Sequence, residues 1–125
     1  MRKTVLSMLL GVALAASFVT ATSANAADTC VDVTGAKACW HADGDYFLLT
    51  DTAADGHHTE VSWAIPGRQG ICQNFTGKGS VKKCAYDFPE HQLLAYRVSV
   101  WEGNEFIRGS KQVNDCTSPE GGICA

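Results

Sequence analysis

The densest group of side chains capable of chemistry lies in DTAADGHHTEVSW, residues 51–63. Two aspartates, two adjacent histidines and one glutamate fall within ten residues there, and such groups can bind metal ions or transfer protons. Compared with an EF-hand loop starting at Asp51, the segment has carboxylates at positions 1 and 5 and the required glycine at position 6. Ala53 and Ser62, however, stand at positions 3 and 12, so the calcium pattern is incomplete.

The alternative for this segment is a polar turn. Asp55 and Gly56 are typical turn residues, an alternating strand follows from Thr59, and Asp51 would cap the strand before the turn. The sequence favours the turn and predicts no bound metal. If an ion does bind, we expect its ligands to be Asp51, Asp55 and Glu60.

The histidines and serines suggest neither a zinc site nor a catalytic centre. His57 and His58 are adjacent, and neighbouring residues of a strand point to opposite faces, so both cannot easily reach one ion. The Gly-x-Ser-x-Gly elbow is absent, and Ser80 follows no phosphate-binding loop. Cysteines of an exported chain are better used in disulfides than as metal ligands. We therefore expect no cofactor and no enzymatic activity.

The start of the chain has the pattern of a secretory signal peptide. A short basic beginning is followed by an apolar run over residues 5–19, which is too short for a confident membrane span, and by an Ala-x-Ala cleavage pattern at residues 24–26. We predict a leader over residues 1–26 and a single secreted, extracellular domain over residues 27–125. No later segment is long and apolar enough to span a bilayer.

The charge balance narrows the choice of partners. Without the leader, eight of the ten Lys and Arg remain against thirteen Asp and Glu, which gives a formal charge of −5. This acidic balance argues against a nucleic-acid partner, which would need a basic face. The remaining 99 of the 125 residues suffice for one domain with a modest core, so covalent cross-links would help it to stay folded.

All six cysteines lie beyond the predicted leader, and their even number in a short exported chain predicts three disulfides. In CVDVTGAKAC, a two-residue turn sets Asp32 opposite Lys37 and brings the two cysteines into a non-hydrogen-bonded pair, close enough for a disulfide. In CQNFTGKGSVKKC, a glycine loop over residues 77–79 closes a second hairpin, with Phe75 opposite Val81. The predicted pairs are Cys30–Cys39, Cys72–Cys84 and Cys116–Cys124.

The pattern of short segments predicts an all-β fold. Runs rich in Val, Thr, Tyr, Phe and Trp are separated by turn residues every eight to twelve positions. The clearest predicted strands span residues 45–51, 60–66, 93–103 and 105–113. Alternation places Arg97 and Ser99 outward, and the side chains expected on the inward faces are Val61, Trp63, Ile65, Leu94, Tyr96, Val98 and Val100. Seven or eight strands without substantial helix would form a small, disulfide-stapled antiparallel β-sandwich of the Ig-like or fibronectin-like kind.

DTAADGHHTEVSW, a central Gly-x-Gly-Ser and the late LLAYRVSVWEGNEFIRGS resemble small uncharacterised secreted proteins of filamentous actinobacteria. Those proteins have an Asp-Thr-x-x-Asp-Gly-His segment before an alternating strand, and a late Arg-Val-x-Val-x-Glu strand of the fibronectin type III kind. The resemblance covers residues 45–113. It implies an Ig-like or fibronectin-like sandwich, and it implies no activity.

Aromatic and basic side chains define the candidate binding surface. By alternation, Trp101 shares the polar face of its strand with Arg97, and an exposed Trp beside an Arg is a typical binding hot spot. The loop over residues 66–70 is a second candidate surface, and the face of Trp40 is left open. The alternative is that each tryptophan packs against a disulfide or the second sheet. The candidate binding residues are Trp101, Arg97, Trp40, Arg68 and Gln69.

These features predict a secreted, noncatalytic binding module. Its expected partner is another secreted or surface protein, which it would serve as an adaptor, an inhibitor or a component of an assembly. The alternative is a carbohydrate- or cell-wall-binding domain that holds a polysaccharide on an aromatic platform, and a small secreted hydrolase is third. Exposed tryptophans would favour the first two, whereas a cleft that joins two carboxylates, or a histidine with a carboxylate, would favour the hydrolase.

Overall fold

The structure of the chain, a computed structural model, describes residues 29–119 and 124. This part of the chain forms nine β-strands and no helix. The strands are β1 (Thr29–Val33), β2 (Ala36–His41), β3 (Tyr46–Asp51), β4 (His58–Ile65), β5 (Arg68–Asn74), β6 (Val81–Ala85), β7 (Leu93–Glu102), β8 (Glu105–Gly109) and β9 (Val113–Cys116). The predicted leader, residues 1–26, lies outside the described residues. Within them, no helix is long and apolar enough to cross a membrane.

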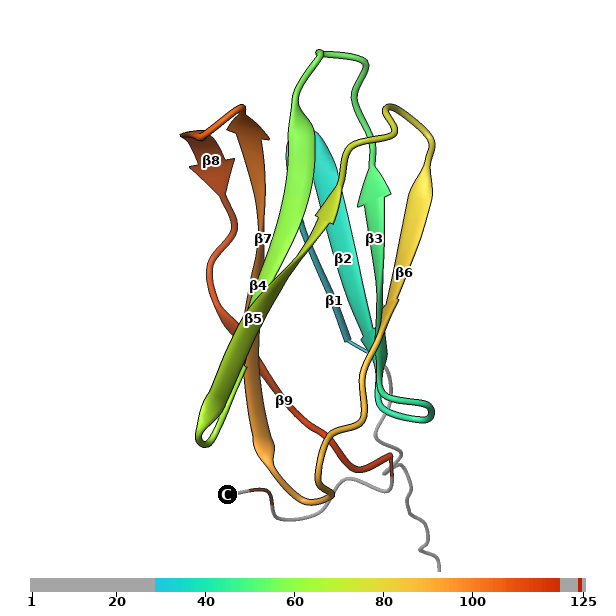
Figure 1. Cartoon of the computed structure of the whole chain (residues 1–125), viewed down its shortest axis with the longest axis vertical. Helices are drawn as coiled ribbons and strands as arrows, with labels where there is room; N and C mark the ends of the chain where they lie inside the picture. Colours follow the sequence, from blue (N-terminus) through green and yellow to red (C-terminus); the bar gives the residue numbers. More distant parts are fainter. Residues whose placement is uncertain (1–28, 120–123, 125) are drawn as a thin grey trace, which may run out of the picture.

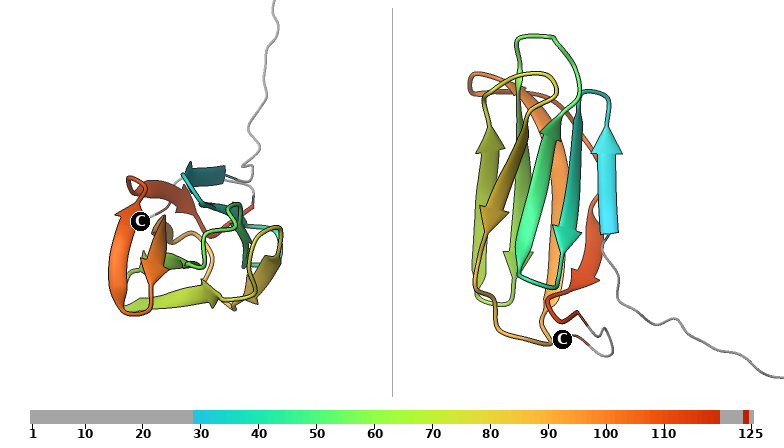
Figure 2. Two further views of the ribbon diagram at one scale, coloured as in Figure 1. Left: turned by 90° about the horizontal axis from the view of Figure 1, so that it is seen from above. Right: turned by 90° about the vertical axis from the view of Figure 1, so that its right-hand side faces the viewer.

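The strands form two antiparallel sheets that pack face to face (Figure 1). One sheet has the order β1-β2-β3-β6, and the other has the order β5-β4-β7-β8, with β9 also paired to β7. Seen from above, the sheets lie on opposite sides of a common interior (Figure 2). The predicted antiparallel, disulfide-stapled β-sandwich is therefore confirmed.

The β1–β2 hairpin has the predicted register. Asp32 lies opposite Lys37, and Cys30 lies opposite Cys39, across a turn in which Gly35 has a φ of 99°. Glycine supplies this positive φ without steric cost. The disulfide joins the cysteine pair at a Cα–Cα distance of 4.0 Å.

The second predicted hairpin is wrong, although its disulfide is present. Cys72 and Cys84 are bonded, with their Cα atoms 6.3 Å apart. However, β5 pairs with β4 and β6 pairs with β3, in different sheets, so Phe75 is not the partner of Val81. The chain crosses between the sheets at residues 75–80, and this disulfide ties together an edge strand of each sheet.

The last part of the chain departs from the single strand predicted over residues 105–113. It forms β8 and β9, which pair with different stretches of β7 and are separated by residues 110–112. The third predicted disulfide, Cys116–Cys124, is present. The indole N–H of Trp40 donates to the Cys116 carbonyl at 3.1 Å, so β9 is attached to the four-stranded sheet through the core.

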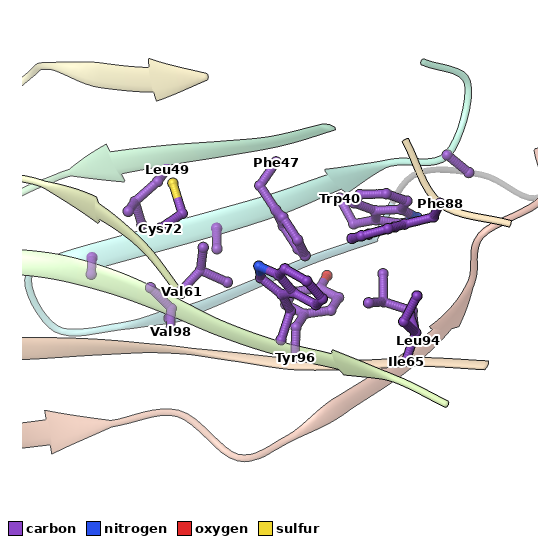
Figure 3. Packing of buried hydrophobic residues seen from close by; sticks show 14 of the residues in the cluster. Trp40, Phe47, Leu49, Val61, Ile65, Cys72, Phe88, Leu94, Tyr96 and Val98 are labelled. Atoms are coloured by element: carbon purple, nitrogen blue, oxygen red, sulfur yellow. The ribbon is translucent and has the colours of Figure 1, made fainter. Parts of the chain in front are cut away.

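The inward side chains of both sheets form one core that is rich in aromatic rings (Figure 3). The ring centroid of Trp40 lies 4.8 Å from that of Phe47 and 5.6 Å from that of Phe88. The inward residues predicted by alternation in β4 and β7 all face this core: Val61, Trp63, Ile65, Leu94, Tyr96, Val98 and Val100. Burial raises the pKa of Tyr96, so its hydroxyl stays protonated and donates to the Thr29 carbonyl at 2.9 Å.

Candidate binding face

The five-stranded sheet turns one face to the core and the other outward. Antiparallel pairing aligns β5, β4 and β7 in rows whose side chains share a face. The outward rows are Gln69–Ala64–Ala95, Ile71–Ser62–Arg97, Gln73–Glu60–Ser99 and His58–Trp101. Phe75 and Phe106 pack on the two ends of the last row. We call this surface the outer face.

Aromatic rings gather in the last row of the outer face. The ring of Phe75 stacks on His58 with centroids 4.2 Å apart, and Phe106 meets Trp101 edge to face at 5.5 Å. Phe75 is 67% exposed and Phe106 is 48% exposed, whereas His58 is only 8% exposed. These four residues, the aromatic row, run from the end of β5 to β8 and place two large rings in contact with solvent.

Asn74, the last residue of β5, holds the loop that carries Phe75. Its side chain is buried, and its amide N–H groups donate to the carbonyls of Leu49 and Ser80 at 3.1 and 3.2 Å. Its side-chain oxygen accepts from the Thr76 backbone N–H at 3.0 Å, as in an Asx turn. Phe75 therefore leaves β5 on a loop with a defined conformation.

The two rings at the other end of the aromatic row are also fixed in place. The Trp101 indole N–H donates to the Ser99 hydroxyl at 2.8 Å, which turns the ring toward the neighbouring row. The Phe106 ring lies over Gly109, where a Cβ atom would approach the ring to 3.1 Å. A larger residue at position 109 would therefore displace Phe106.

The rows next to the aromatic row are polar. Gln73 donates to the Glu60 carboxylate at 3.0 Å, so this acid has a partner from its own row. Arg97 lies one row further away and is exposed, and its side chain has no hydrogen bond, ion pair or ring contact with another described residue. Arg97 is also the only Lys or Arg in the outward rows. The outer face thus combines open aromatic rings with one unpaired cation.

Three of the predicted binding residues lie on the outer face. Arg97 and Gln69 are exposed, and Trp101 is half-buried in the aromatic row. Ser99 points outward as alternation predicted, but neighbouring side chains cover it and leave it 2% exposed.

Two of the predicted binding residues lie elsewhere. Trp40 is wholly buried in the core, so no partner can reach it. Arg68 lies on the core side of β5, where its guanidinium sits 5.5 and 5.2 Å from the ring centroids of Trp63 and Phe88. The predicted loop over residues 66–70 is a two-residue turn between β4 and β5, so it projects no free arginine.

The carboxylates of the opening segment do not converge on one site. Asp51 is buried at the end of β3 and accepts the Ala53 backbone N–H at 3.1 Å, whereas Glu60 points to the outer face. Asp55 accepts the His57 backbone N–H at 3.0 Å in the turn before β4. Among the described residues, no three His, Cys, Asp or Glu side chains form a group that could hold a metal ion.

His57 lies between two carboxylates at the rim of the outer face. Its Nδ1 is 3.2 Å from Asp55 Oδ2, and its Nε2 is 3.3 Å from Glu102 Oε1. The backbone N–H of His57 holds the pKa of Asp55 below its usual value against a smaller opposing effect of burial, and the approach of the imidazole lowers this pKa further. Both ring nitrogens already face acids, so His57 is poorly placed to take a proton from a nucleophile.

The sequence did not reveal Phe75, Phe106 or Asn74 as parts of a site. The alternation of β7 indicated the face of Trp101, but the rings that flank it come from the end of β5 and from β8. A single signal was available: the turn at residues 103–104 brings Phe106 back beside Trp101.

No known protein family, curated protein or solved structure matches the chain, so the site rests on its own geometry.

Proposed function

We propose that this chain is a secreted, noncatalytic binding module that recognises another protein through the outer face. The proposal for its location is supported by three disulfides, which persist in oxidising compartments, together with the leader pattern of residues 1–26. Cleavage after Ala26 is the corresponding expectation for the N-terminus of the exported protein.

The aromatic row is the observation that carries the binding proposal. Exposing Phe75 and Phe106 keeps apolar surface in water, and clusters of this kind mark interaction sites in soluble proteins. Aromatic residues and arginine are also the side chains enriched at protein interfaces, and here Arg97 lies on the same face.

The orientation of the rings favours a protein partner over a polysaccharide. A sugar chain stacks on rings that present one flat platform, but the planes of Trp101 and Phe106 are inclined at 81° to each other. Ile71, which is 55% exposed two rows away, extends the apolar surface with an aliphatic side chain that offers no ring for stacking. An uneven surface of this kind suits the interdigitating side chains of a protein.

The test is selection of a random dodecapeptide phage library on the oxidised protein. We expect wild type to retain a defined set of peptides, and Phe75→Ser to reduce their affinity about 30-fold, as for a hot-spot side chain. Val81→Ser is the matched control, because Val81 is 56% exposed on the other sheet. It should leave the affinity unchanged.

The alternative functions have their own readouts in the same experiment. If no peptide is retained while insoluble cell wall or polysaccharide binds the protein, the proposal is wrong and the carbohydrate alternative takes its place. Peptides that bind wild type and Phe75→Ser equally well would also overturn it, because the aromatic row would then not be the binding site.

A further inference from the structure

Arg97 projects from the middle of β7 on the outer face. Its register partner is Ser62, and its neighbours on the same side of β7 are Ala95 and Ser99. These side chains are too short to cover a guanidinium group. The exposed Ile71 lies in the same row as Arg97, on the far side of Ser62.

The acids near Arg97 do not neutralise it. Glu60 stands diagonally across from it in the adjacent row, but no ion pair forms within 4.0 Å and Gln73 donates to the Glu60 carboxylate. Glu102 lies at the far end of β7 and faces His57. The exposed guanidinium of Arg97, which has no acidic partner among the described residues, is therefore complementary to a carboxylate of a partner.

The spacing of the rows determines how a ligand can reach both features. Arg97 and Trp101 are four residues apart on one strand, which corresponds to about 13 Å at the rise of a β-strand. An extended ligand segment aligned with β7 has the same rise. Its side chains at positions 1, 3 and 5 therefore fall over Arg97, the Glu60 row and the aromatic row.

We propose, on the basis of the proposed function, that the partner binds as an extended acidic segment with a carboxylate opposite Arg97 and an apolar side chain four residues away on the aromatic row. The planar guanidinium donates two parallel hydrogen bonds to a carboxylate, while the rings of Phe75 and Phe106 cover the apolar group. The segment can run in either direction along β7, because the rows fix the spacing and not the polarity.

The row between these two anchors adds a selectivity rule. A side chain at the middle position lies over the half-buried Gln73 and above the carboxylate of Glu60, a residue that is only 7% exposed, so it should be polar and uncharged or small. An acid there would face the Glu60 carboxylate and would be repelled. The recognised pattern is therefore acidic, any residue, polar, any residue, apolar, or its reverse.

The experiment uses synthetic peptides taken from the selected phage pool and measures affinity by fluorescence anisotropy. Replacing the acidic residue of the peptide by its amide should weaken binding to wild type about tenfold. Arg97→Gln should bind the acidic peptide about tenfold more weakly, and it should no longer distinguish acid from amide. Lys37→Gln removes the same charge on the other sheet, where Lys37 is exposed, and should behave as wild type.

The outcomes separate this inference from the proposed function. If peptides bind in a Phe75-dependent way but show neither the acidic spacing nor any effect of Arg97→Gln, the acidic-segment inference is overturned and the binding module stands. If no peptide is retained at all, the proposed function fails first. If wild type binds polygalacturonate instead of peptides, and Arg97→Gln no longer binds it, both the inference and the proposed function are overturned in favour of an anionic polysaccharide.

Discussion

The two sheets treat their outward aromatic rings in opposite ways. On the four-stranded sheet, Tyr46 is stacked on His41 with ring centroids 4.6 Å apart, and the ammonium of Lys83 lies 4.3 Å above the Tyr46 ring. On the five-stranded sheet, Phe75 covers His58 from one side but keeps its own outward surface open. The same fold thus covers one aromatic cluster with a lysine and leaves the other exposed.

This difference distinguishes the outward surfaces of the two sheets. The four-stranded sheet also carries the Cys30–Cys39 disulfide on its outward side, and there Asp32 lies opposite Lys37. Within the described part of the chain, the outer face has an arginine side chain without a partner, and Phe75 and Phe106 stay exposed. Four variants test whether structural support and the proposed binding are divided between the two sheets.

Removing the cross-link of the four-stranded sheet should cost stability without affecting binding. The double substitution Cys30→Ser and Cys39→Ser opens a loop of nine-residue separation, which should lower the free energy of unfolding by about 2–3 kcal/mol. Denaturant unfolding measures this loss. The peptide affinity of the folded variant should stay at the wild-type value. A loss of affinity as large, in free energy, as the loss of stability would show that the two faces are not independent.

Asn74→Ala should damage both stability and the outer face. The substitution removes the Asn74 hydrogen bonds to the Leu49 and Ser80 carbonyls and the acceptor of the Thr76 N–H, so we expect a loss of about 2 kcal/mol. Hydrogen exchange should increase at residues 75–80. Thr76→Ala is the control, because it removes one hydroxyl and keeps the Asn74 amide. If residues 75–80 exchange as fast in Thr76→Ala as in Asn74→Ala, the Asn74 amide is not what holds this loop.

Ser99→Ala should loosen the Trp101 ring with a small effect on folding. The indole N–H loses a 2.8 Å hydrogen bond, but Trp101 is only half-buried and water can replace the hydroxyl, so the cost should be about 1 kcal/mol or less. The tryptophan emission spectrum should shift. Ser62→Ala on the same face should leave the spectrum unchanged, and an identical shift there would contradict the assignment.

Acid should affect the rim of the outer face through Asp55. Because the folded pKa of this group is lowered, its contribution is present above the unfolded value near 3.8 and is lost as pH falls through the folded pKa. The difference in unfolding free energy between wild type and Asp55→Asn should therefore be constant at neutral pH and shrink in acid. The effect should be small, because Asp55 is near solvent, and a difference that grows in acid would contradict it.

The sequence predicted those parts of the fold that depend on local pairing. The Cys30–Cys39 register followed from one two-residue turn, and the inward residues of β4 and β7 followed from alternation, because both depend on neighbours in the chain. The Cys72–Cys84 segment has equally suitable turn residues, yet its two strands joined different sheets. Turn composition does not distinguish a hairpin from a crossover between sheets.

The candidate site was predictable only in part for the same reason. Alternation assigned Trp101 and Arg97 to one face, but their surroundings come from strands that are distant in sequence. The sequence does not determine the face of Trp40, because the burial of this ring depends on Phe88, which enters the core from the connection between β6 and β7. The exposure of Phe75 likewise depends on the buried amide of Asn74, whose hydrogen bonds no local pattern reveals.

The Cys72–Cys84 bond also bears on how the protein would survive proteolysis. The crossover at residues 75–80 carries the exposed Phe75, and exposed loop tips are preferred sites of cleavage. Because the disulfide closes a ring around this segment, a single cut between residues 73 and 83 leaves the two fragments covalently joined. Both sheets would keep their strands in register after such a nick, and Arg97 and Trp101 would stay in place.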